Sequence, residues 1–122
     1  MPPRVQKEYI TVVKDDEHWH SLVNSESKKL SVVDVHLTWC GPCSLLAQTF
    51  RSIALKIDDW DSRIQFLTVD VERVHSLKDV QNSSQPKFIF YLGSKIVAEV
   101  KGVNVPQIMA YINRYIPSLE SD

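Results

Sequence analysis

Two cysteines, Cys40 and Cys43, are the only ones in this chain, and two residues separate them. A disulfide forms and breaks when a thiolate attacks a sulfur atom, so the attacking cysteine must be exposed and partly ionised. If Cys43 lies in the first turn of a helix, Cys40 lies at the helix N-terminus, where backbone N–H groups and the dipole favour a thiolate. Gly41 and Pro42 favour a tight turn into such a helix. The motif therefore indicates reversible thiol–disulfide chemistry.

Zinc binding and a purely structural disulfide are the alternative interpretations of this cysteine pair. A structural zinc site takes four protein ligands, and a catalytic site takes three plus water. The chain has no second cysteine pair, and its four histidines are scattered without zinc-motif spacing: His18, His20, His36 and His75. A disulfide that closes so small a ring removes little entropy from the unfolded chain. Redox chemistry therefore leads, with no metal or cofactor expected.

Length and charge limit the remaining classes of function. A chain of 122 residues fits one domain, and 14 basic against 15 acidic residues give no argument for nucleic acid or an anionic membrane. No apolar run approaches the length of a membrane span, and the polar N-terminus has no signal-peptide core. Two neighbouring reactive cysteines suit a reducing compartment. We expect a cytoplasmic protein that binds neither nucleic acid nor membrane.

The pattern of apolar residues predicts alternating strands and helices after a loose leader at residues 1–7. Expected strands are 9–13, 31–37, 64–69, 88–92 and 96–100, the last two joined by Gly93 and Ser94 as a hairpin. Expected helices begin near residue 16, at 42 or 43, near 71 and at 105. The second of these runs to about Ile57 and is closed by the stretch 58–61.

The helices are expected to bury one apolar side each. The first carries Trp19, Leu22 and Val23 behind an acidic first turn that Asp15 can cap. The second places Leu46, Phe50, Ile53 and Ile57 on one face, and the short third helix has Val71, Val74 and Leu77. Asn104 caps the last helix, with Pro106 near its first turn, and the apolar positions are Val105, Ile108, Met109, Ile112 and Ile116. Gly102 is expected to end the preceding strand.

Asp34 is an acid inside the apolar strand that precedes the cysteines. The neighbours Val33 and Val35 argue for burial, and a carboxylate cannot be buried cheaply while charged, so its pKa should rise. A carboxyl group of this kind can accept a proton near neutral pH. The alternative is an aspartate that faces solvent at the strand end.

Taken together, these features resemble the thioredoxin family over nearly the whole chain. The motif Trp39-Cys40-Gly41-Pro42-Cys43 ends the second strand, Asp34 stands six residues before Cys40, and Pro86 opens the hairpin strand. Gly93 and Gly102 also fall at the glycine positions of the family. The resemblance implies an α/β fold with a central mixed β-sheet flanked by helices, in the order β-α-β-α-β-α-β-β-α. It implies one domain over residues 8–118.

The resemblance also implies a role for each site residue. Cys40 would be the nucleophile, Cys43 the resolving thiol, and Asp34 the acceptor of the Cys43 proton. The groove for the partner would be formed by Trp39, Gly41, Pro42, Gln85, Pro86, Lys101 and Gly102. Pro86 would be the cis-proline of the family. The implied activity is that of a protein-disulfide reductase, and the resemblance implies thioredoxin reductase as a partner.

Several positions depart from the family pattern. Ser44 stands where a lysine usually follows the second cysteine, and Phe66 stands where a lysine lies near the buried acid. Gln48 replaces the proline that kinks the active-site helix. With two cations absent, the thiolate should be less stabilised than in a general thioredoxin. His36 would compensate in part if protonated; the alternative is a hydrogen-bonded strand histidine.

A narrower resemblance involves the hairpin 88–93 and the segment 97–104. It is similar to the thioredoxin modules of cilia, both those fused to nucleoside-diphosphate-kinase-like domains and the light chains of axonemal outer-arm dynein. A free-standing module of 122 residues favours the light chains. The implied partner is a dynein heavy chain, and the implied location is the axoneme of a cilium or flagellum. The alternatives are a free cytosolic thioredoxin and a thioredoxin-fold binding module whose cysteines are dispensable.

Overall fold

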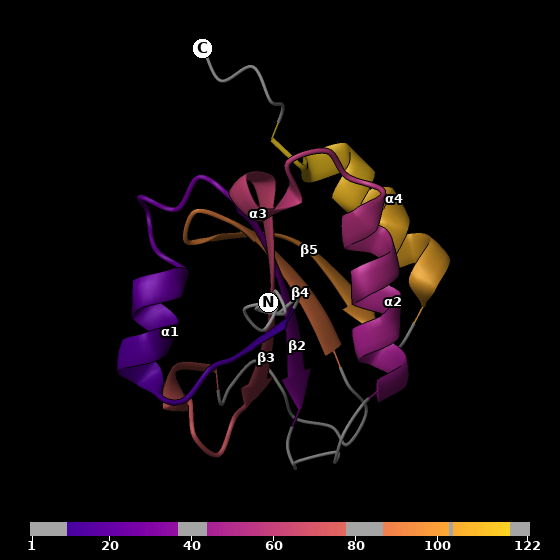
Figure 1. Ribbon diagram of the computed structural model, residues 1–122. Coiled ribbons are helices and arrows are strands. Elements are labelled where there is room, and N and C mark those ends of the chain that lie inside the picture. Colours follow the sequence, from indigo (N-terminus) through magenta and orange to yellow (C-terminus); the bar gives the residue numbers. More distant parts are fainter. Residues whose placement is uncertain (1–9, 37–43, 78–86, 103, 118–122) are drawn as a thin grey trace, which may run out of the picture.

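A computed structural model describes residues 10–36, 44–77, 87–102 and 104–117, which form a mixed β-sheet with helices on both faces (Figure 1). This is the α/β architecture expected from the sequence. The strands are β1 (Ile10–Val12), β2 (Leu30–His36), β3 (Ile64–Asp70), β4 (Lys87–Leu92) and β5 (Lys95–Lys101). The helices are α1 (Asp16–Leu22), α2 (Ser44–Leu55), α3 (Trp60–Arg63), the 3₁₀-helix η1 (His75–Leu77) and α4 (Val105–Tyr115).

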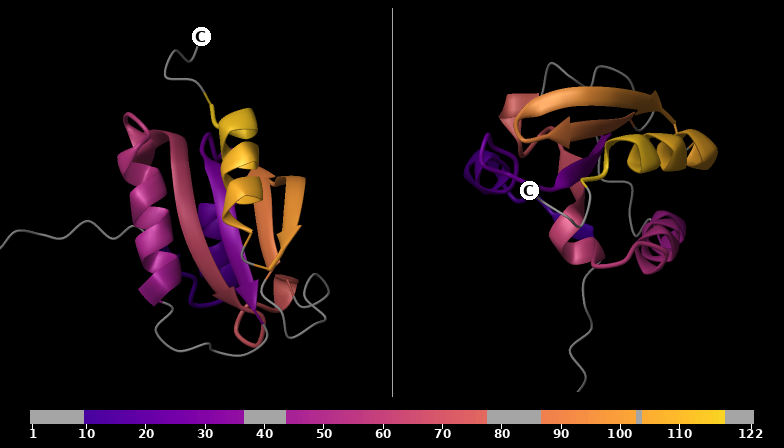
Figure 2. Two further views of the ribbon diagram at one scale, coloured as in Figure 1. Left: turned by 90° about the vertical axis from the view of Figure 1, so that its right-hand side faces the viewer. Right: turned by 90° about the horizontal axis from the view of Figure 1, so that it is seen from above.

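The sheet has the strand order β1-β3-β2-β4-β5, with β2 at its centre. β1 and β2 pair parallel with β3, whereas β4 pairs antiparallel with both β2 and β5. Helices α2 and α4 cover one face of the sheet, and α1 and η1 lie on the other (Figures 1 and 2). Because β2 is covered on both faces, its sequence is nearly continuously apolar instead of alternating.

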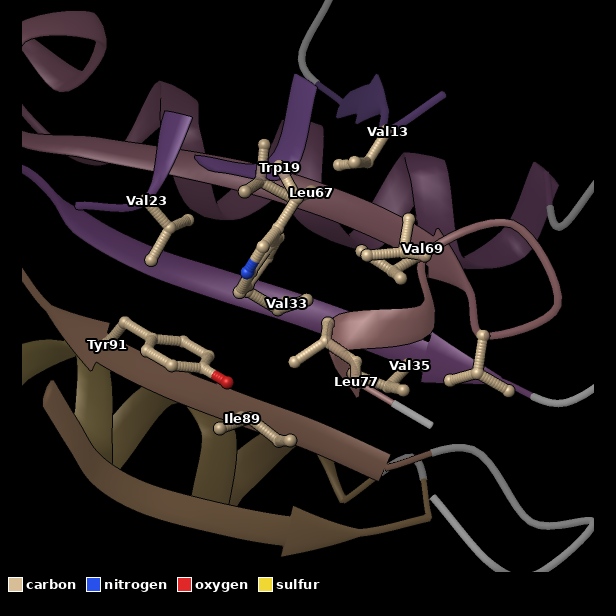
Figure 3. Close-up of a cluster of buried hydrophobic side chains, with 12 residues drawn as sticks. Val13, Trp19, Val23, Val33, Val35, Leu67, Val69, Leu77, Ile89 and Tyr91 are labelled. Carbon is tan, nitrogen blue, oxygen red and sulfur yellow. The ribbon is translucent and has the colours of Figure 1, made fainter. Parts of the chain in front are cut away.

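The face under α1 holds one of two hydrophobic clusters (Figure 3). Trp19 of α1 packs edge-on against Tyr91 of β4, with ring centroids 5.3 Å apart. Val33 and Val35 of β2 contribute to this cluster, together with Val13, Val23, Leu67, Val69, Val71, Val74, Leu77 and Ile89. The three apolar positions predicted for the short third helix, Val71, Val74 and Leu77, are therefore all buried here.

The opposite face holds the second cluster, under α2 and α4. Phe50 of α2 stacks on Phe66 of β3, with centroids 4.5 Å apart and planes 17° apart, and meets Phe88 of β4 edge-on at 5.9 Å. From α4, Ile108 and Ile112 are buried in the same cluster. The expected apolar face of α2 is confirmed at Phe50 and Ile53, whereas the side chain of Leu46 lies outside the described residues. That of α4 is confirmed at Ile108 and Ile112, and the predicted positions Ile57, Met109 and Ile116 are partly buried against the cluster.

Local signals in the sequence explain where the helices begin. The side chain of Asp15 accepts a hydrogen bond from the backbone N–H of His18 at 2.8 Å, and Asn104 accepts one from Gln107 at 3.2 Å. Pro106 lies in the first turn of α4, where its missing N–H costs no intrahelical bond. Both predicted N-caps are confirmed.

The hairpin β4–β5 turns through Gly93 and Ser94, as predicted. Gly93 has φ +63°, and among the described non-glycine residues only Asp59 has a positive φ, so the turn has the type II′ pattern with glycine first. The pairing register shifts between Phe90 and Tyr91, which places a β-bulge at Val97. β5 ends at Lys101, and Gly102 follows with φ +73°, in agreement with the predicted end of the strand.

Three element predictions need correction. The second helix ends at Leu55, and the stretch expected only to close it begins the short helix α3, which follows Asp59 in a left-handed conformation with φ 56°. Among the described residues, β1 covers only Ile10–Val12, although the N–H of Val13 still donates to the carbonyl of Thr68. The short third helix is a single 3₁₀ turn. In the part of the chain that is described, no helix has the length and hydrophobicity of a membrane span.

Candidate active site

Asp34 lies in the middle strand of the sheet and is buried, with only 3% of its surface exposed. Alternate residues of a strand point to the same face, so Asp34 shares the face of Leu30 and Val32, which belong to the cluster under α2. The predicted burial of this acid is confirmed, and the alternative of a solvent-facing aspartate is wrong. The carboxyl group therefore lies on the face of the sheet that α2 covers.

The N-terminal end of α2 lies at the same end of the sheet as the carboxyl ends of β2 and β3 (Figure 2). α2 begins at Ser44, the residue that follows Cys43 in the sequence, and Asp34 stands two residues before the last residue of β2. Phe50 anchors the helix to the sheet through its contacts with Phe66 and Phe88. The buried acid and the first residue after the cysteine motif thus belong to elements that meet at one end of the domain.

The strands β4 and β5 bring further predicted site residues to this end. Because β4 runs antiparallel to β2, its first residue, Lys87, pairs with Val35, and Lys101 of β5 pairs with Lys87 on the other side. Lys101 is exposed and Gly102 is half-buried. Lys87 directly follows Pro86 in the sequence. The register therefore groups Asp34, Lys87, Lys101 and Gly102 at the carboxyl end of β2.

Most of the predicted chemistry falls outside the described residues. This applies to Cys40 and Cys43, and also to the groove positions Trp39, Gly41, Pro42, Gln85 and Pro86. The side chain of His36, the last residue of β2, likewise lies outside the described part. Within the described ranges, no three histidine, cysteine, aspartate or glutamate side chains form a group that could hold a metal ion.

Two neighbours of Asp34 were not identified as site residues from the sequence. Thr68 of β3 and Phe88 of β4 are its direct partners on the two adjacent strands. Lys87 pairs instead with Val35, so it lies on the opposite face of the sheet from Asp34. Only the register reveals Thr68 and Phe88, because each is distant in sequence from the acid that it flanks. Thr68 supplies a hydroxyl group next to the position of Asp34, and Phe88 supplies apolar surface.

Phe66 occupies the position at which the family resemblance leads one to expect a lysine. It is 1% exposed, and its ring stacks on Phe50. On β3 it lies two residues before Thr68, the partner of Asp34, and on the same face. An aromatic stack thus fills the space next to the acid's strand position, and it fastens α2 to the sheet.

Comparison with known proteins gives one family. The family model described as Thioredoxin matches residues 10–114. Among relatives, the chain is 32% identical to the "Dynein 14 kDa light chain, flagellar outer arm" of Chlamydomonas reinhardtii, over 91% of this chain and 81% of that protein. It is 34% identical to the "Thioredoxin domain-containing protein 3 homolog" of Ciona intestinalis, over 79% of this chain but only 14% of that longer protein.

Solved structures agree with the family. The chain is 30% identical to the reduced thioredoxin pre-protein of Schistosoma mansoni, with a TM-score of 0.69 and coverage of 88% of this chain and 98% of that one. Thioredoxin NaTrxh of Nicotiana alata, at 21% identity, shares the fold with a TM-score of 0.70 over 95% and 100% of the two chains. The thioredoxin fold predicted from the sequence is thus confirmed.

Proposed function

Because this chain belongs to the thioredoxin family, we propose that it is a dithiol–disulfide oxidoreductase acting through Cys40 and Cys43. The thiolate of Cys40 attacks one sulfur of a partner disulfide, forms a mixed disulfide and releases one partner thiolate. Cys43 then loses its proton, attacks the sulfur of Cys40 and releases the second partner thiolate. The partner gains two electrons, and a Cys40–Cys43 disulfide remains. Thioredoxin reductase is the candidate that restores the dithiol.

The burial of Asp34 carries this proposal. A carboxyl group with 3% exposure, on the face covered by α2, costs stability when charged. Burial of this kind raises a carboxyl pKa, so we expect the group to accept and return a proton near neutral pH. By the family resemblance, the proton to be moved is that of Cys43, the residue before the first residue of α2. A merely structural position in an apolar core would hold an apolar residue at lower cost.

Paired cysteine variants test the redox step. Cys43→Ser should trap a mixed disulfide with a partner through Cys40, whereas Cys40→Ser should trap none, because it removes the attacking thiolate. Limiting iodoacetamide should label Cys40 of the reduced wild-type protein first, since a thiolate at a helix N-terminus is the more ionised. Preferential labelling of Cys43, or equal trapping by both variants, would refute the assigned roles.

We further propose that the protein acts as a light-chain subunit of axonemal outer-arm dynein. The support is the similarity to the Chlamydomonas light chain, which covers 91% of this chain and 81% of that protein. The partner would be a dynein heavy chain, and the location the axoneme of a cilium or flagellum. The test is extraction of axonemes from the source cells and sedimentation in a sucrose gradient. Co-sedimentation with the outer-arm heavy chains supports the proposal, and recovery only as a free small protein supports a free cytosolic thioredoxin.

A double variant separates chemistry from docking. Cys40→Ser/Cys43→Ser removes both thiols and changes no residue of the described sheet and helices. If this variant still co-sediments with the heavy chains and restores motility to cells that lack the protein, the cysteines are dispensable and the chain is a binding module. If it co-sediments but fails to restore motility, the redox step is used on the motor. The two halves of the proposal can thus fail independently.

Lys101 supports selectivity of the predicted groove. It is exposed at the end of β5, so its ammonium group is presented to a partner at this end of the hairpin. A partner segment that buried this end of the groove without matching acidic or polar groups would leave buried polar groups unsatisfied, at about 1–3 kcal/mol each. The cost of these unsatisfied polar groups disfavours unmatched partners, which is one route to binding specificity.

Lys101→Val tests this selectivity, and Lys95→Val is the matched control. Both lysines are exposed on β5, but Lys95 lies at the opposite end of the strand, next to the hairpin turn. We expect Lys101→Val to raise the rate of insulin reduction relative to reduction of an acidic disulfide peptide, and Lys95→Val to leave the ratio unchanged. An unchanged ratio in both variants would show that the groove does not select by charge.

A further inference from the structure

Ser76 is an exposed serine in the one-turn helix η1, on the sheet face opposite Asp34. It lies against α1, which is 60 residues away in the sequence: its backbone N–H donates to Oδ1 of Asp16 at 2.8 Å. Its Oγ lies 3.3 Å from Nε2 of His20, one helical turn further along α1. These two contacts, together with the buried side chains of Val74 and Leu77, hold η1 on α1.

The carboxyl group of Asp16 is the charge that faces Ser76. Hydrogen bonds from Ser76 lower the pKa of Asp16, and the neighbouring His75 acts in the same direction. Asp16 is therefore ionised at neutral pH. His75 itself contacts the carbonyl oxygen of Glu72 through Nε2, at 3.2 Å.

The sequence around Ser76 fits a basophilic serine kinase. Arg73 stands three residues before the serine and is exposed, as are Glu72 and His75. Kinases that select arginine at this spacing recognise its guanidinium through paired carboxylates. We propose that Ser76 is a phosphorylation site for a kinase of this class, and that the phosphate releases η1 from α1. This inference does not rest on the redox function.

The reaction uses ATP as the co-reactant. The γ-phosphoryl group passes to Oγ of Ser76, the new P–O bond replaces the bond to ADP, and the hydroxyl proton leaves to the catalytic base of the kinase. A kinase binds its substrate in extended form, so η1 must open first. A single 3₁₀ turn, with the bond from the N–H of Leu77 to the carbonyl of Val74 at 3.1 Å, belongs to the parts of a fold that open most easily.

Once phosphorylated, the turn closes poorly. A phosphoserine carries a charge of about −1.5 to −2 at pH 7, and next to an aspartate it acts by like-charge repulsion. The closed position of Ser76 would set this charge beside the ionised carboxylate of Asp16. Among the described residues, His20 and the adjacent His75 could attract it, so the balance between Asp16 and these two histidines decides the effect. Asp16 accepts the backbone N–H of Ser76 and cannot move away without losing that bond, so repulsion should prevail.

The first experiment asks whether Ser76 accepts phosphate. The purified full chain is incubated with the catalytic subunit of cAMP-dependent protein kinase and ATP, and the sites are mapped by mass spectrometry. We expect phosphate at Ser76, none there in Ser76→Ala, and a rate lower by roughly tenfold or more in Arg73→Gln, as for lost charge-assisted hydrogen bonds. No phosphate on Ser76, or a rate that does not depend on Arg73, would overturn the assignment.

The second experiment asks whether charge at Ser76 loosens η1. Ser76→Glu is compared with the isosteric Ser76→Gln by thermal unfolding and by hydrogen exchange of α1 and η1, in the parent and in an Asp16→Asn background. We expect faster exchange and a lower Tm for the glutamate variant in the parent, and a smaller difference when Asp16 is neutralised. Equal behaviour of the glutamate and glutamine variants in the parent would refute the release of η1.

Discussion

The stack of Phe50 on Phe66 should be a main attachment of α2 to the sheet, and its contribution to stability can be worked out from the structure. Phe66 is 1% exposed, and its ring lies 4.5 Å from that of Phe50, centroid to centroid. Truncation of a buried phenylalanine to alanine costs about 3–5 kcal/mol, and an aromatic pair adds about 0.5–1.5 kcal/mol beyond the buried area. Phe66→Ala should therefore remove a large part of a total stability of about 5–15 kcal/mol.

A double-mutant cycle isolates the stack itself. Phe50→Leu, Phe66→Leu and the double variant are unfolded in urea and followed by circular dichroism. The single variants should each lose stability, and the double variant should lose about 0.5–1.5 kcal/mol less than their sum, because either change alone already removes the stacked pair. A coupling energy near zero would show that the rings contribute only by burial, and a cost below about 1 kcal/mol for Phe66→Ala would refute the packing argument.

The same position tests whether the lysine suggested by the family resemblance can be restored. Phe66→Lys would place an ammonium group at a site with 1% exposure and would remove the ring that holds α2. A buried charge costs several kcal/mol even after relaxation, so the variant should be much less stable than the matched apolar control Phe66→Met. Near-equal stability of the two variants would mean that the carboxyl group of Asp34 is positioned to pair with the new cation.

Three further predictions follow from single residues. Asp34→Asn should slow disulfide reduction near neutral pH by about tenfold or more. The stability of this variant relative to the parent should grow as pH rises above about 4, because a carboxyl with a raised folded pKa destabilises the fold once the unfolded chain ionises. Greater sensitivity of the variant to urea at pH 8 would contradict this. Burial raises the pKa of Tyr91 to about 12, with Glu99 adding to the effect. The parent should therefore lose about 1.4 kcal/mol of unfolding free energy at about pH 11 relative to Tyr91→Phe, as measured by urea unfolding from neutral pH to about pH 11. An equal loss of stability in both proteins at alkaline pH would contradict the shift. Gly102 has φ +73°, and a Cβ atom at this position would have no heavy atom within 4 Å outside the adjoining residues. Gly102→Ala should therefore cost about 1–2 kcal/mol of stability through backbone strain alone, and Gly102→Asn should cost less. Equal losses for alanine and asparagine in urea unfolding would exclude that cause.

Local sequence signals predicted the elements well because each acts over a few residues. The caps at Asp15 and Asn104, the hairpin turn at Gly93 and the end of β5 before Gly102 depend on backbone chemistry within one turn. The burial of Asp34 was also predictable, since its strand is apolar on both sides of it. Here the pattern alone was sufficient.

Features that depend on tertiary contacts were not predictable in the same way. The helix α3 was missed because the acidic stretch around Asp59 looks like a turn, and four residues are too few to show a helical pattern of apolar positions. The neighbours of Asp34 on the adjacent strands depend on register, and Thr68 is 34 positions away along the chain. The contact between Asp16 and Ser76 joins segments 60 residues apart. No local propensity encodes such pairs.

The two faces of the sheet allow a final prediction that joins the redox proposal to the proposed phosphorylation. Asp34 lies on the face under α2, whereas Ser76 and its contacts lie on the face of α1. Changes at sites without shared partners usually add to within about 0.3–0.5 kcal/mol. The change in unfolding free energy of Asp34→Asn/Ser76→Glu should therefore equal the sum of the changes in the two single variants. A larger deviation would mean that the loosening of η1 reaches the buried acid through β2 and β3, whose side chains line both faces. In that case, Ser76→Glu alone should also change the reactivity of the thiols.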